Sequence, residues 1–413
     1  MYYFCNMIEL SKHIEVLLLE NDCVIVPGLG GFIAHKRQAA YSIQKGREES
    51  QENTDGESVT GEAVNEDTVA KMKVIENVID TYFYKEDVDK DAMVDGIYKG
   101  MVESLGDPYS EYYSKEELES LYQDSFGVYY GVGAYVSLDT TTGLAKVSGI
   151  IADSPAEEAD LRAEDIIYKV DDVDVTGMSL QETVSLIKGD ENTTVKLTLI
   201  RDGKEIEKEV TRRKVESPTV NFKMLDDGMA YIQITEFDTV TVDQFTEAMA
   251  MARGNDMKGL ILDLRSNPGG NLSSVVSIAK QMLPKGLIVY TEDRDGNREE
   301  YSCDGSKELD VPMVVLVNGN SASASEILAG AIKDYGIGTL VGTTTFGKGI
   351  VQRPIELSDG SAVKLTISSY YTPNGINIHG IGIEPDVECE FDSERYYSDE
   401  AYDNQLEKAK EVL

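Results

Sequence analysis

The segment Met313-Val-Val-Leu-Val-Asn-Gly-Asn-Ser-Ala-Ser-Ala-Ser-Glu-Ile-Leu-Ala-Gly-Ala-Ile-Lys-Asp334 runs from an apolar strand through a serine-rich loop into an amphipathic helix. Met313–Val317 is continuously apolar, as expected of a strand that is buried on both faces. Residues 324–334 repeat apolar side chains at helical spacing. A buried strand that leads directly into a helix is typical of an α/β fold with a core sheet.

The same alternation extends on both sides of this segment and predicts an α/β core over residues 214–390. Short strand-rich runs predict a small β-rich module at 127–213, and periodic apolar residues predict helices at 67–126. Residues 48–67 are rich in Asp and Glu and contain no Lys or Arg. This composition predicts an unfolded linker at 48–66. Residues 391–413 are expected to form an acidic C-terminal tail that ends in a short helix.

Composition excludes several classes of protein. The 413 residues carry 38 Lys plus Arg against 75 Asp plus Glu, a net charge of −37 that disfavours nucleic-acid partners. The 3 histidines and 4 cysteines show no metal-ligand spacing, so neither a metal nor a cofactor is expected. Cys5 could pair with Cys23 and Cys303 with Cys389, or all four could be free thiols. No apolar run is long enough for a membrane span, and no signal peptide is predicted.

Ser323 lies at the start of the helix that follows the apolar strand, and two interpretations of it are open. With Glu326 three residues later it forms the pattern of a capping box, which is an ordinary structural role for serine. A serine at a helix start also lies among unpaired N–H groups, which would stabilise an oxyanion formed by nucleophilic attack.

Lys348 follows the loop Gly342-Thr-Thr-Thr-Phe-Gly347 and is also open to more than one interpretation. It could be a solvated lysine or part of a phosphate loop, but Gly349 replaces the Ser or Thr that would hold magnesium. A third possibility is that Lys348 is a general base, which requires an apolar pocket that keeps its amine neutral. Phe346 and Ile350 are expected to supply that pocket. A lysine base also suits a chain with so few histidines.

A Pro-Gly-Gly turn, Pro268-Gly269-Gly270, follows the predicted strand at residues 260–264. It could be a simple tight loop. Alternatively, glycine lets main-chain N–H groups come close to an acyl oxygen, as an oxyanion hole requires.

These segments together resemble the C-terminal processing peptidases, the tail-specific serine proteases that contain a PDZ domain. The matching motifs are Gly106-Asp-Pro-Tyr-Ser110, Leu264-Arg-Ser-Asn-Pro-Gly-Gly270, Ser321-Ala-Ser-Ala-Ser-Glu-Ile327, Phe346-Gly-Lys-Gly349 with Gln352, and Gly380-Ile-Gly-Ile-Glu-Pro-Asp386. The resemblance implies a ClpP/crotonase-like α/β protease core, with Ser323 as nucleophile, Lys348 as base and Gln352 orienting that base. It implies an oxyanion hole formed by the amides of Gly269 (or Gly270) and Ala324.

The resemblance also makes residues 127–213 the family's PDZ domain, which would capture a substrate C-terminus. Tyr130-Gly131-Val132-Gly133 would be the carboxylate loop, while Val184 and Ile187 either line the side-chain pocket or are plain core residues. Asp160 and Glu164 stand where such domains usually have glycine, which questions the local turn geometry.

Residues 1–47 resemble the start of a bacterial HU-like domain without its basic DNA-binding arms. The expected partners are therefore protein or peptide substrates, with no nucleic acid. The family resemblance further implies a dimer or larger ring and a location outside the cytoplasm. The alternative functions are an inactive PDZ scaffold on a protease fold, and DNA binding through residues 1–47.

Overall fold

A computed structural model describes residues 62–413 except 86, 140–141 and 399–401. The chain divides into two compact units, Met1–Val88 and Asp89–Leu413, and each is described by itself. The HU-like segment lies outside the described residues, as does most of the predicted linker. In the first unit the structure describes α3 (Glu66–Tyr82), whose N-cap Asn65 accepts the amide of Thr68 at 3.0 Å.

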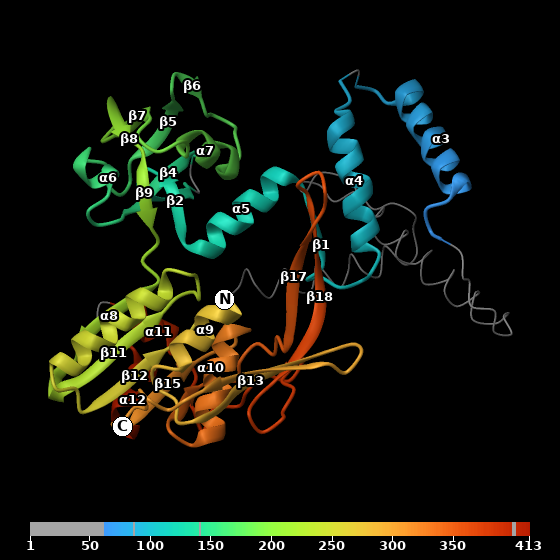
Figure 1. Cartoon of the computed structure of the whole chain (residues 1–413). Helices are drawn as coiled ribbons and strands as arrows, with labels where there is room; N and C mark the ends of the chain where they lie inside the picture. The colour runs from blue at the N-terminus through green and yellow to red at the C-terminus, as the bar shows by residue number, and fades with distance from the viewer. Residues whose placement is uncertain (1–61, 86, 140–141, 399–401) are drawn as a thin grey trace, which may run out of the picture. The chain divides into compact units, whose positions relative to one another are not determined.

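The centre of the second unit is a six-stranded sheet (Figure 1). Its first strand is antiparallel to its neighbour and the remaining pairs are parallel. Their order across the sheet is β10 (Val220–Met224), β11 (Met229–Ile234), β12 (Gly259–Asp263), β15 (Met313–Val317), β16 (Thr339–Gly342) and β19 (Val387–Glu388). A 3-10 turn, Asp226–Gly228, joins the first two. β12 and β15 correspond to the strands that the sequence predicted at residues 260–264 and at Met313–Val317.

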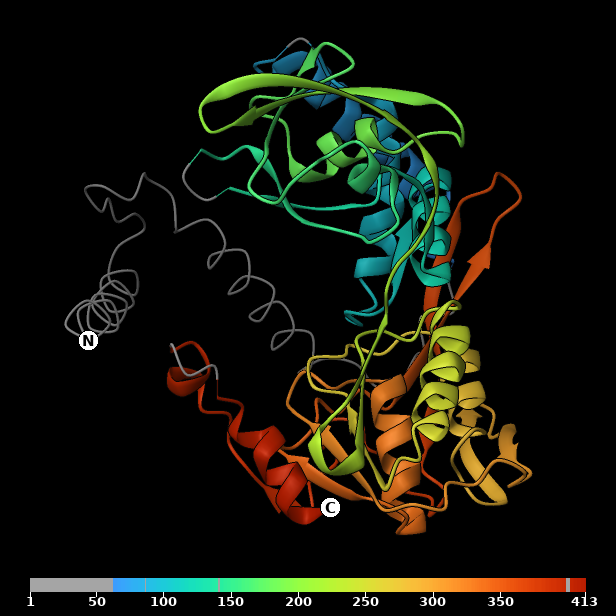
Figure 2. The same cartoon turned by 90° about the vertical axis from the view of Figure 1, so that its left-hand side faces the viewer.

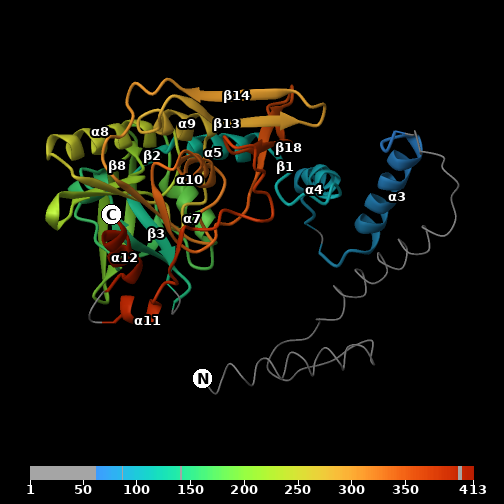
Figure 3. The same ribbon diagram turned by 90° about the horizontal axis from the view of Figure 1, so that it is seen from below.

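Both faces of this sheet are covered by helices, and the side chains alternate between them. Ile232 and Leu260 point to the side of α8 (Thr241–Gly254), α9 (Leu272–Ala279) and α10 (Ala324–Tyr335). Tyr231 and Ile261 point to the opposite side, where α12 (Asn404–Val412) packs. Figure 2 shows the three helices and the C-terminal helix on opposite sides of the strands, and Figure 3 shows the same layers from below.

The acidic C-terminal segment ends in a helix, as expected, and this helix packs against the core sheet. After the short α11 (Ser393–Tyr396), α12 buries Ala409 completely against the sheet. Arg265 follows β12 and bonds both Asp403, at 2.8 Å, and the fully buried Asp263, at 2.6 Å. The acidic residue at the start of α12 is therefore a partner of a half-buried arginine, so this segment is part of the core.

A second sheet carries a long hairpin beside the core. Its strands are β1 (Glu111–Tyr113), β18 (Ala362–Tyr371), β13 (Gly286–Asp293) and β14 (Arg298–Cys303), with β17 (Ile350–Glu356) paired to β18. The helix α4 (Lys90–Glu103) precedes β1 in the chain, and α5 (Lys115–Phe126) follows it. A capping box starts α5, since Ser114 and Glu117 exchange hydrogen bonds.

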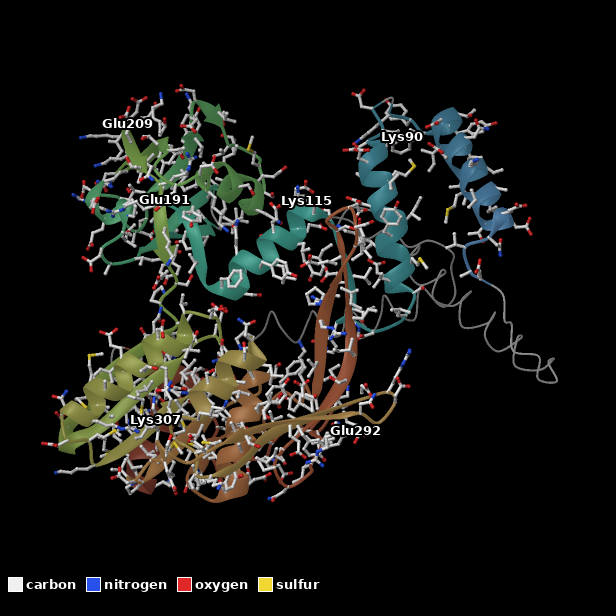
Figure 4. All side chains as sticks on the ribbon, in the orientation of Figure 1. Lys90, Lys115, Glu191, Glu209, Glu292 and Lys307 are labelled. Carbon is white, nitrogen blue, oxygen red and sulfur yellow. The ribbon has the colours of Figure 1, made fainter. Side chains whose placement is uncertain are left out.

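The β-rich module has its own core and a six-stranded sheet. The strands are β3 (Ala134–Leu138), β4 (Ala145–Ile150), β5 (Ile166–Val170), β6 (Val173–Asp174), β7 (Thr194–Arg201) and β8 (Lys204–Thr211); a separate pair is β2 (Val128–Gly131) with β9 (Arg213–Glu216), and the helices are α6 (Pro155–Glu158) and α7 (Leu180–Ile187). Figure 4 labels Glu191 and Glu209 on this module. Asp160 and Glu164 take the left-handed conformation of glycine, with φ of 56° and 74°.

Two expectations about the whole chain can be compared with the described residues. Cys303 and Cys389 are free thiols, so the suggested bond between them is absent, while Cys5 and Cys23 lie outside the described residues. In the part of the chain that the structure describes, no helix has both the length and the apolar character needed to span a bilayer.

Candidate active site

Three of the sequence motifs meet at one edge of the core sheet. The Pro-Gly-Gly turn follows β12, the serine-rich loop follows β15, and the loop that carries Lys348 follows β16. These strands are parallel neighbours, so their carboxyl ends lie side by side. Ligands of open α/β sheets bind at this edge.

The three serines of the motif have different environments. Ser321 and Ser325 are completely buried, and their hydroxyls donate to the carbonyl oxygens of Leu264 at 2.8 Å and Asn267 at 3.0 Å. They attach this loop to the segment after β12. The middle residue, Ser323, is half-buried and lines a cavity of about 410 Å³.

Ser323 has a backbone conformation that few residues other than glycine adopt, with φ of 54° and ψ of −113°. An N-cap normally lies in the extended region, and its side chain accepts an amide of the first turn. Here the amide of Glu326 donates to the carbonyl oxygen of Ser323, at 2.9 Å. In the described chain, the Ser323 hydroxyl makes no cap hydrogen bond to α10. Such strain is concentrated at functional sites.

Glu326 connects the serine loop to the lysine loop. Its carboxylate is completely buried and accepts four hydrogen bonds. The donors are the amide of Ser323 at 2.9 Å, the Thr345 hydroxyl at 2.6 Å, and the amides of Gly347 at 2.7 Å and Lys348 at 2.9 Å. One side chain thus fixes the main chain of both residues that the sequence singled out.

The amine of Lys348 lies 4.6 Å from the centre of the Tyr109 ring, and both residues line the cavity. Burial lowers the pKa of Lys348, the charge of Lys364 lowers it further, and Asp107 opposes these effects. Ile350 lines the cavity as expected. Phe346 was expected to shield the amine, but it is 55% exposed and does not line the cavity, because its loop turns it to solvent. Tyr109 provides the ring instead.

Gln352 lies on β17 beside the lysine loop and also lines the cavity. Its Nε2 donates to the Thr366 hydroxyl at 3.1 Å. The amide of Thr366 in turn donates to the Ser110 hydroxyl at 3.1 Å, and that hydroxyl donates to Asp107. These bonds tie the turn that carries Tyr109 to the β17–β18 hairpin.

The Pro-Gly-Gly turn lies directly against the serine. A Cβ added at Gly269 would be 2.7 Å from the Cβ of Ser323 and 3.0 Å from the amide nitrogen of Ala324. The amide of Gly269 already donates to the Asn267 side chain at 2.8 Å. Gly270 lines the cavity, and within the described chain neither its amide nor that of Ala324 has an acceptor. The geometry therefore favours Gly270 over Gly269 as an amide donor.

The cavity is lined by loops, by residues of the helices α5, α9 and α10, and by the β17–β18 hairpin. No histidine is among the described residues that line it, and His379 is exposed. Among the described residues, no cluster of three or more His, Cys, Asp or Glu could hold a metal ion. Among the described residues, the basic side chains that share the cavity with Ser323 are thus Lys348 and Lys364.

In the β-rich module, the expected carboxylate loop runs from Gly131, the last residue of β2, through Val132 to Gly133. The carbonyls of Val132 and Gly133 accept amides of Ala156 and Ile151, whereas their own amides have no acceptor among the described residues. The neighbouring β3 is an edge strand, and α7 packs beside it. On α7, Val184 is half-buried but Ile187 is 4% exposed and belongs to the module core.

Sequence reasoning missed Tyr109, Asn267 and Glu326 as parts of this arrangement. Tyr109 and Asn267 lie inside motifs that the sequence analysis identified, but neither residue was given a role there. Asn267 is completely buried, and its Nδ2 donates to the carbonyl of Ile234 at 2.8 Å. Glu326 was interpreted only as a capping residue, because its contacts to residues 345–348 are separated by about twenty positions in sequence.

Family models match most of the described chain. The model of peptidase family S41 matches residues 228–389, and a PDZ domain model matches residues 146–201. A model of the CCDC81-like prokaryotic HU domain 1 matches residues 7–47, in agreement with the resemblance noted for that segment.

Named relatives point to the same family. The chain is 38% identical over 320 residues to the carboxy-terminal processing protease CtpA of Bacillus subtilis (strain 168), covering 77% of this chain and 68% of that protein. It is 38% identical over 292 residues to the carboxyl-terminal-processing protease of Synechocystis sp. (strain ATCC 27184 / PCC 6803 / Kazusa), covering 69% and 68%. A solved S41 protease structure from Bacteroides fragilis NCTC 9343 shares the fold, with a TM-score of 0.51 at 17% identity over 82% of this chain and 96% of that chain.

Proposed function

The chain belongs to the carboxyl-terminal processing serine proteases of peptidase family S41, and from this membership we propose that it cleaves peptide bonds with a Ser323–Lys348 dyad. The observation that carries the proposal is the cavity shared by a strained serine and a lysine of lowered pKa. Lysine is a competent base only when it is neutral, and desolvation favours the neutral form.

In the proposed reaction, Ser323 Oγ attacks the peptide carbonyl carbon while the neutral Lys348 amine takes the hydroxyl proton. The amides of Gly270 and Ala324 stabilise the oxyanion that develops. The tetrahedral intermediate collapses, and the leaving amine receives the proton from Lys348. Water then attacks the acyl-enzyme, again losing a proton to Lys348, and the new C-terminus is released as Ser323 is regenerated.

We assign Gln352 a positioning role. In the described part of the chain its side chain forms no hydrogen bond with Lys348; it supports β18 through Thr366 next to the turn that carries Tyr109. Gly269 contributes by its lack of a side chain, since any Cβ there would collide with Ser323. The assignment of the oxyanion donors therefore rests on Gly270 and Ala324.

We further propose that the PDZ domain captures the C-terminus of the substrate protein. The free amides of Val132 and Gly133 would bind the terminal carboxylate, and the open edge of β3 would pair with the peptide backbone. Val184 would contact the last side chain, with Ile187 beneath it as part of the core. The family resemblance also suggests action outside the cytoplasm and assembly into dimers or rings, which remain proposals.

Digestion of an unfolded protein such as casein tests the dyad. Ser323→Ala and Lys348→Ala should each reduce cleavage by at least about 10³-fold, because each removes a member of a cooperative unit. His379→Ala is the matched control: it removes the histidine of the protease region, which does not line the cavity, and should retain activity. Cleavage by Lys348→Ala near the wild-type rate would exclude the dyad.

A catalytically inactive PDZ scaffold is the alternative function. The two functions are separated by a serine-reactive phosphonate probe, which labels only an activated nucleophile. Labelling that maps to Ser323 supports the protease, whereas peptide binding without any labelling would support the scaffold.

A further inference from the structure

Asp238 is a buried carboxyl group in the wall of the candidate active site, and the proposed mechanism does not use it. It follows β11, is 7% exposed and lines the same cavity as Ser323. The amide of Asp238 donates to the Thr241 hydroxyl at 2.9 Å, which fixes its main chain.

Within the described part of the chain, the carboxylate of Asp238 has no hydrogen-bond or ion-pair partner. In the described part of the chain, every side-chain oxygen that is shielded from solvent has a hydrogen-bond partner. The oxygens of Asp238 therefore reach the open space of the cavity. A buried carboxylate without a partner is costly unless a ligand supplies a charge or hydrogen bonds.

The surroundings of Asp238 are negative. Glu236 on the same loop and Asp124 near the end of α5 both act electrostatically on it. The end of α5 is held next to Asp238, because the amide of Thr239 and the side chain of Asn271 donate to the carbonyl of Ser125 at 3.2 and 2.7 Å. The lysines that line the cavity, Lys348 and Lys364, come instead from the loop after β16 and from β18.

We propose that Asp238 forms a substrate subsite that binds a cationic side chain, lysine or arginine, of the polypeptide being cleaved. This inference rests on the proposed function, because it assumes that a polypeptide occupies the cavity. The Asp238 carboxylate accepts hydrogen bonds from the cation, and Asp124 and Glu236 add to the negative potential at the entrance. The substrates preferred by this protease would therefore carry a basic residue at one fixed position relative to the cleaved bond.

The titration of Asp238 is consistent with an unfilled cation site. Burial, together with the charges of Glu236 and Asp124, raises the pKa of Asp238 to about 7. A bound ammonium or guanidinium group would favour the ionised form and reverse this effect. The preference for a basic residue should accordingly strengthen as the pH rises from about 6 to 8.

The test measures binding to the full chain with Ser323→Ala, which needs no turnover. The probes are fluorescent peptides with an amidated C-terminus, so that a terminal carboxylate cannot engage the PDZ domain. A single lysine is moved along the peptide and is compared at each position with norleucine. At one position, lysine should bind about 10-fold more tightly than norleucine, and adding Asp238→Asn should remove that preference.

Asp243→Asn is the matched control, because Asp243 is an exposed acid in the first turn of α8 and does not line the cavity. The chain with Asp243→Asn should keep the preference for lysine over norleucine. Thermal melting checks that each variant is folded. Equal affinity for lysine and norleucine at every position, or the same preference in the Asp238→Asn chain, would overturn the subsite. Digestion of casein by the Ser323→Ala chain would instead refute the proposed function and leave the binding result interpretable.

Discussion

The carboxylate of Glu326 accepts the main-chain amide of Lys348 at 2.9 Å, and the same oxygen accepts the amide of Ser323. A single buried atom thereby links the first turn of α10 to the loop after β16. Because this oxygen holds both main chains, the separation of the Ser323 and Lys348 backbones depends on one side chain.

We predict that Glu326→Gln lowers kcat by at least about 10-fold with a smaller change in KM. A carboxamide offers one acceptor oxygen in place of two. Because each carboxylate oxygen of Glu326 accepts two of the four donors, the NH₂ group would face two of them. An unsatisfied buried donor costs about 1–3 kcal/mol. The measurement is steady-state kinetics together with the labelling rate of Ser323. The exposed Glu308→Gln should leave both unchanged. If Glu326→Gln lowers only the melting temperature and not the labelling rate, a positioning role is wrong.

Lys364→Met should move the pH dependence of kcat/KM to higher pH. The positive charge of Lys364 contributes to the lowered pKa of Lys348, after burial, so its removal raises that pKa. Since the neutral amine is the active form, the activity then rises at a higher pH than in the wild type. Lys364 also contacts Glu111 and the Tyr113 hydroxyl, so melting curves must accompany the kinetics. A shift toward lower pH would contradict the electrostatic account.

The sequence identified the residues that gather in the cavity, because each motif directly follows an apolar strand. Parallel strands that are neighbours place such loops at one edge, so local patterns were sufficient for Ser323, Lys348 and Gly270. Which side chain shields Lys348 could not be predicted in this way. Tyr109 precedes Lys348 by more than two hundred positions, and Phe346, which is adjacent in sequence, turns outward.

The other differences come from contacts that composition and spacing do not reveal. The geometry disfavours Gly269 as an oxyanion donor, because its amide already donates to the side chain of Asn267. The acidic composition of residues 391–413 does not reveal that Asp403 forms an ion pair with Arg265. The position of Ile187 in sequence fits both a pocket residue and a core residue. Its burial within the module identifies it as a core residue.

The three serines of the motif should respond differently to alanine substitution. Ser325→Ala and Ser321→Ala each remove a buried hydrogen bond and should lower the free energy of unfolding by about 1–2 kcal/mol. Ser323→Ala should abolish activity while leaving stability nearly unchanged, since in the described chain its hydroxyl caps no amide of α10. Chemical denaturation of the three variants measures this. A large destabilisation in Ser323→Ala would favour a capping role for that residue.

Asp238→Asn should stabilise the fold at alkaline pH. The folded state raises the pKa of Asp238 from 3.8 to about 7, so the folded chain holds a proton that the unfolded chain loses. Stability therefore declines as the pH rises through this range, and the full penalty is present above about 7. The stability gain from Asp238→Asn should be on the order of 2 kcal/mol larger at pH 8 than at pH 4. An equal gain at both pH values, measured by denaturant unfolding, would show that Asp238 is not buried in its charged form.

The central claim is that the neutral amine of Lys348 activates Ser323, and the pH dependence of covalent labelling tests it most directly. The rate at which a serine-reactive phosphonate modifies Ser323, located by peptide mass spectrometry, is measured for the wild type and for Lys348→Ala. We predict a wild-type rate that rises with pH and levels off below the ordinary lysine value of 10.5, because burial lowers the pKa of Lys348. Lys348→Ala should be at least about 10²-fold slower and lose this dependence. Labelling of Lys348→Ala at the wild-type rate, with the same pH profile, would contradict the account.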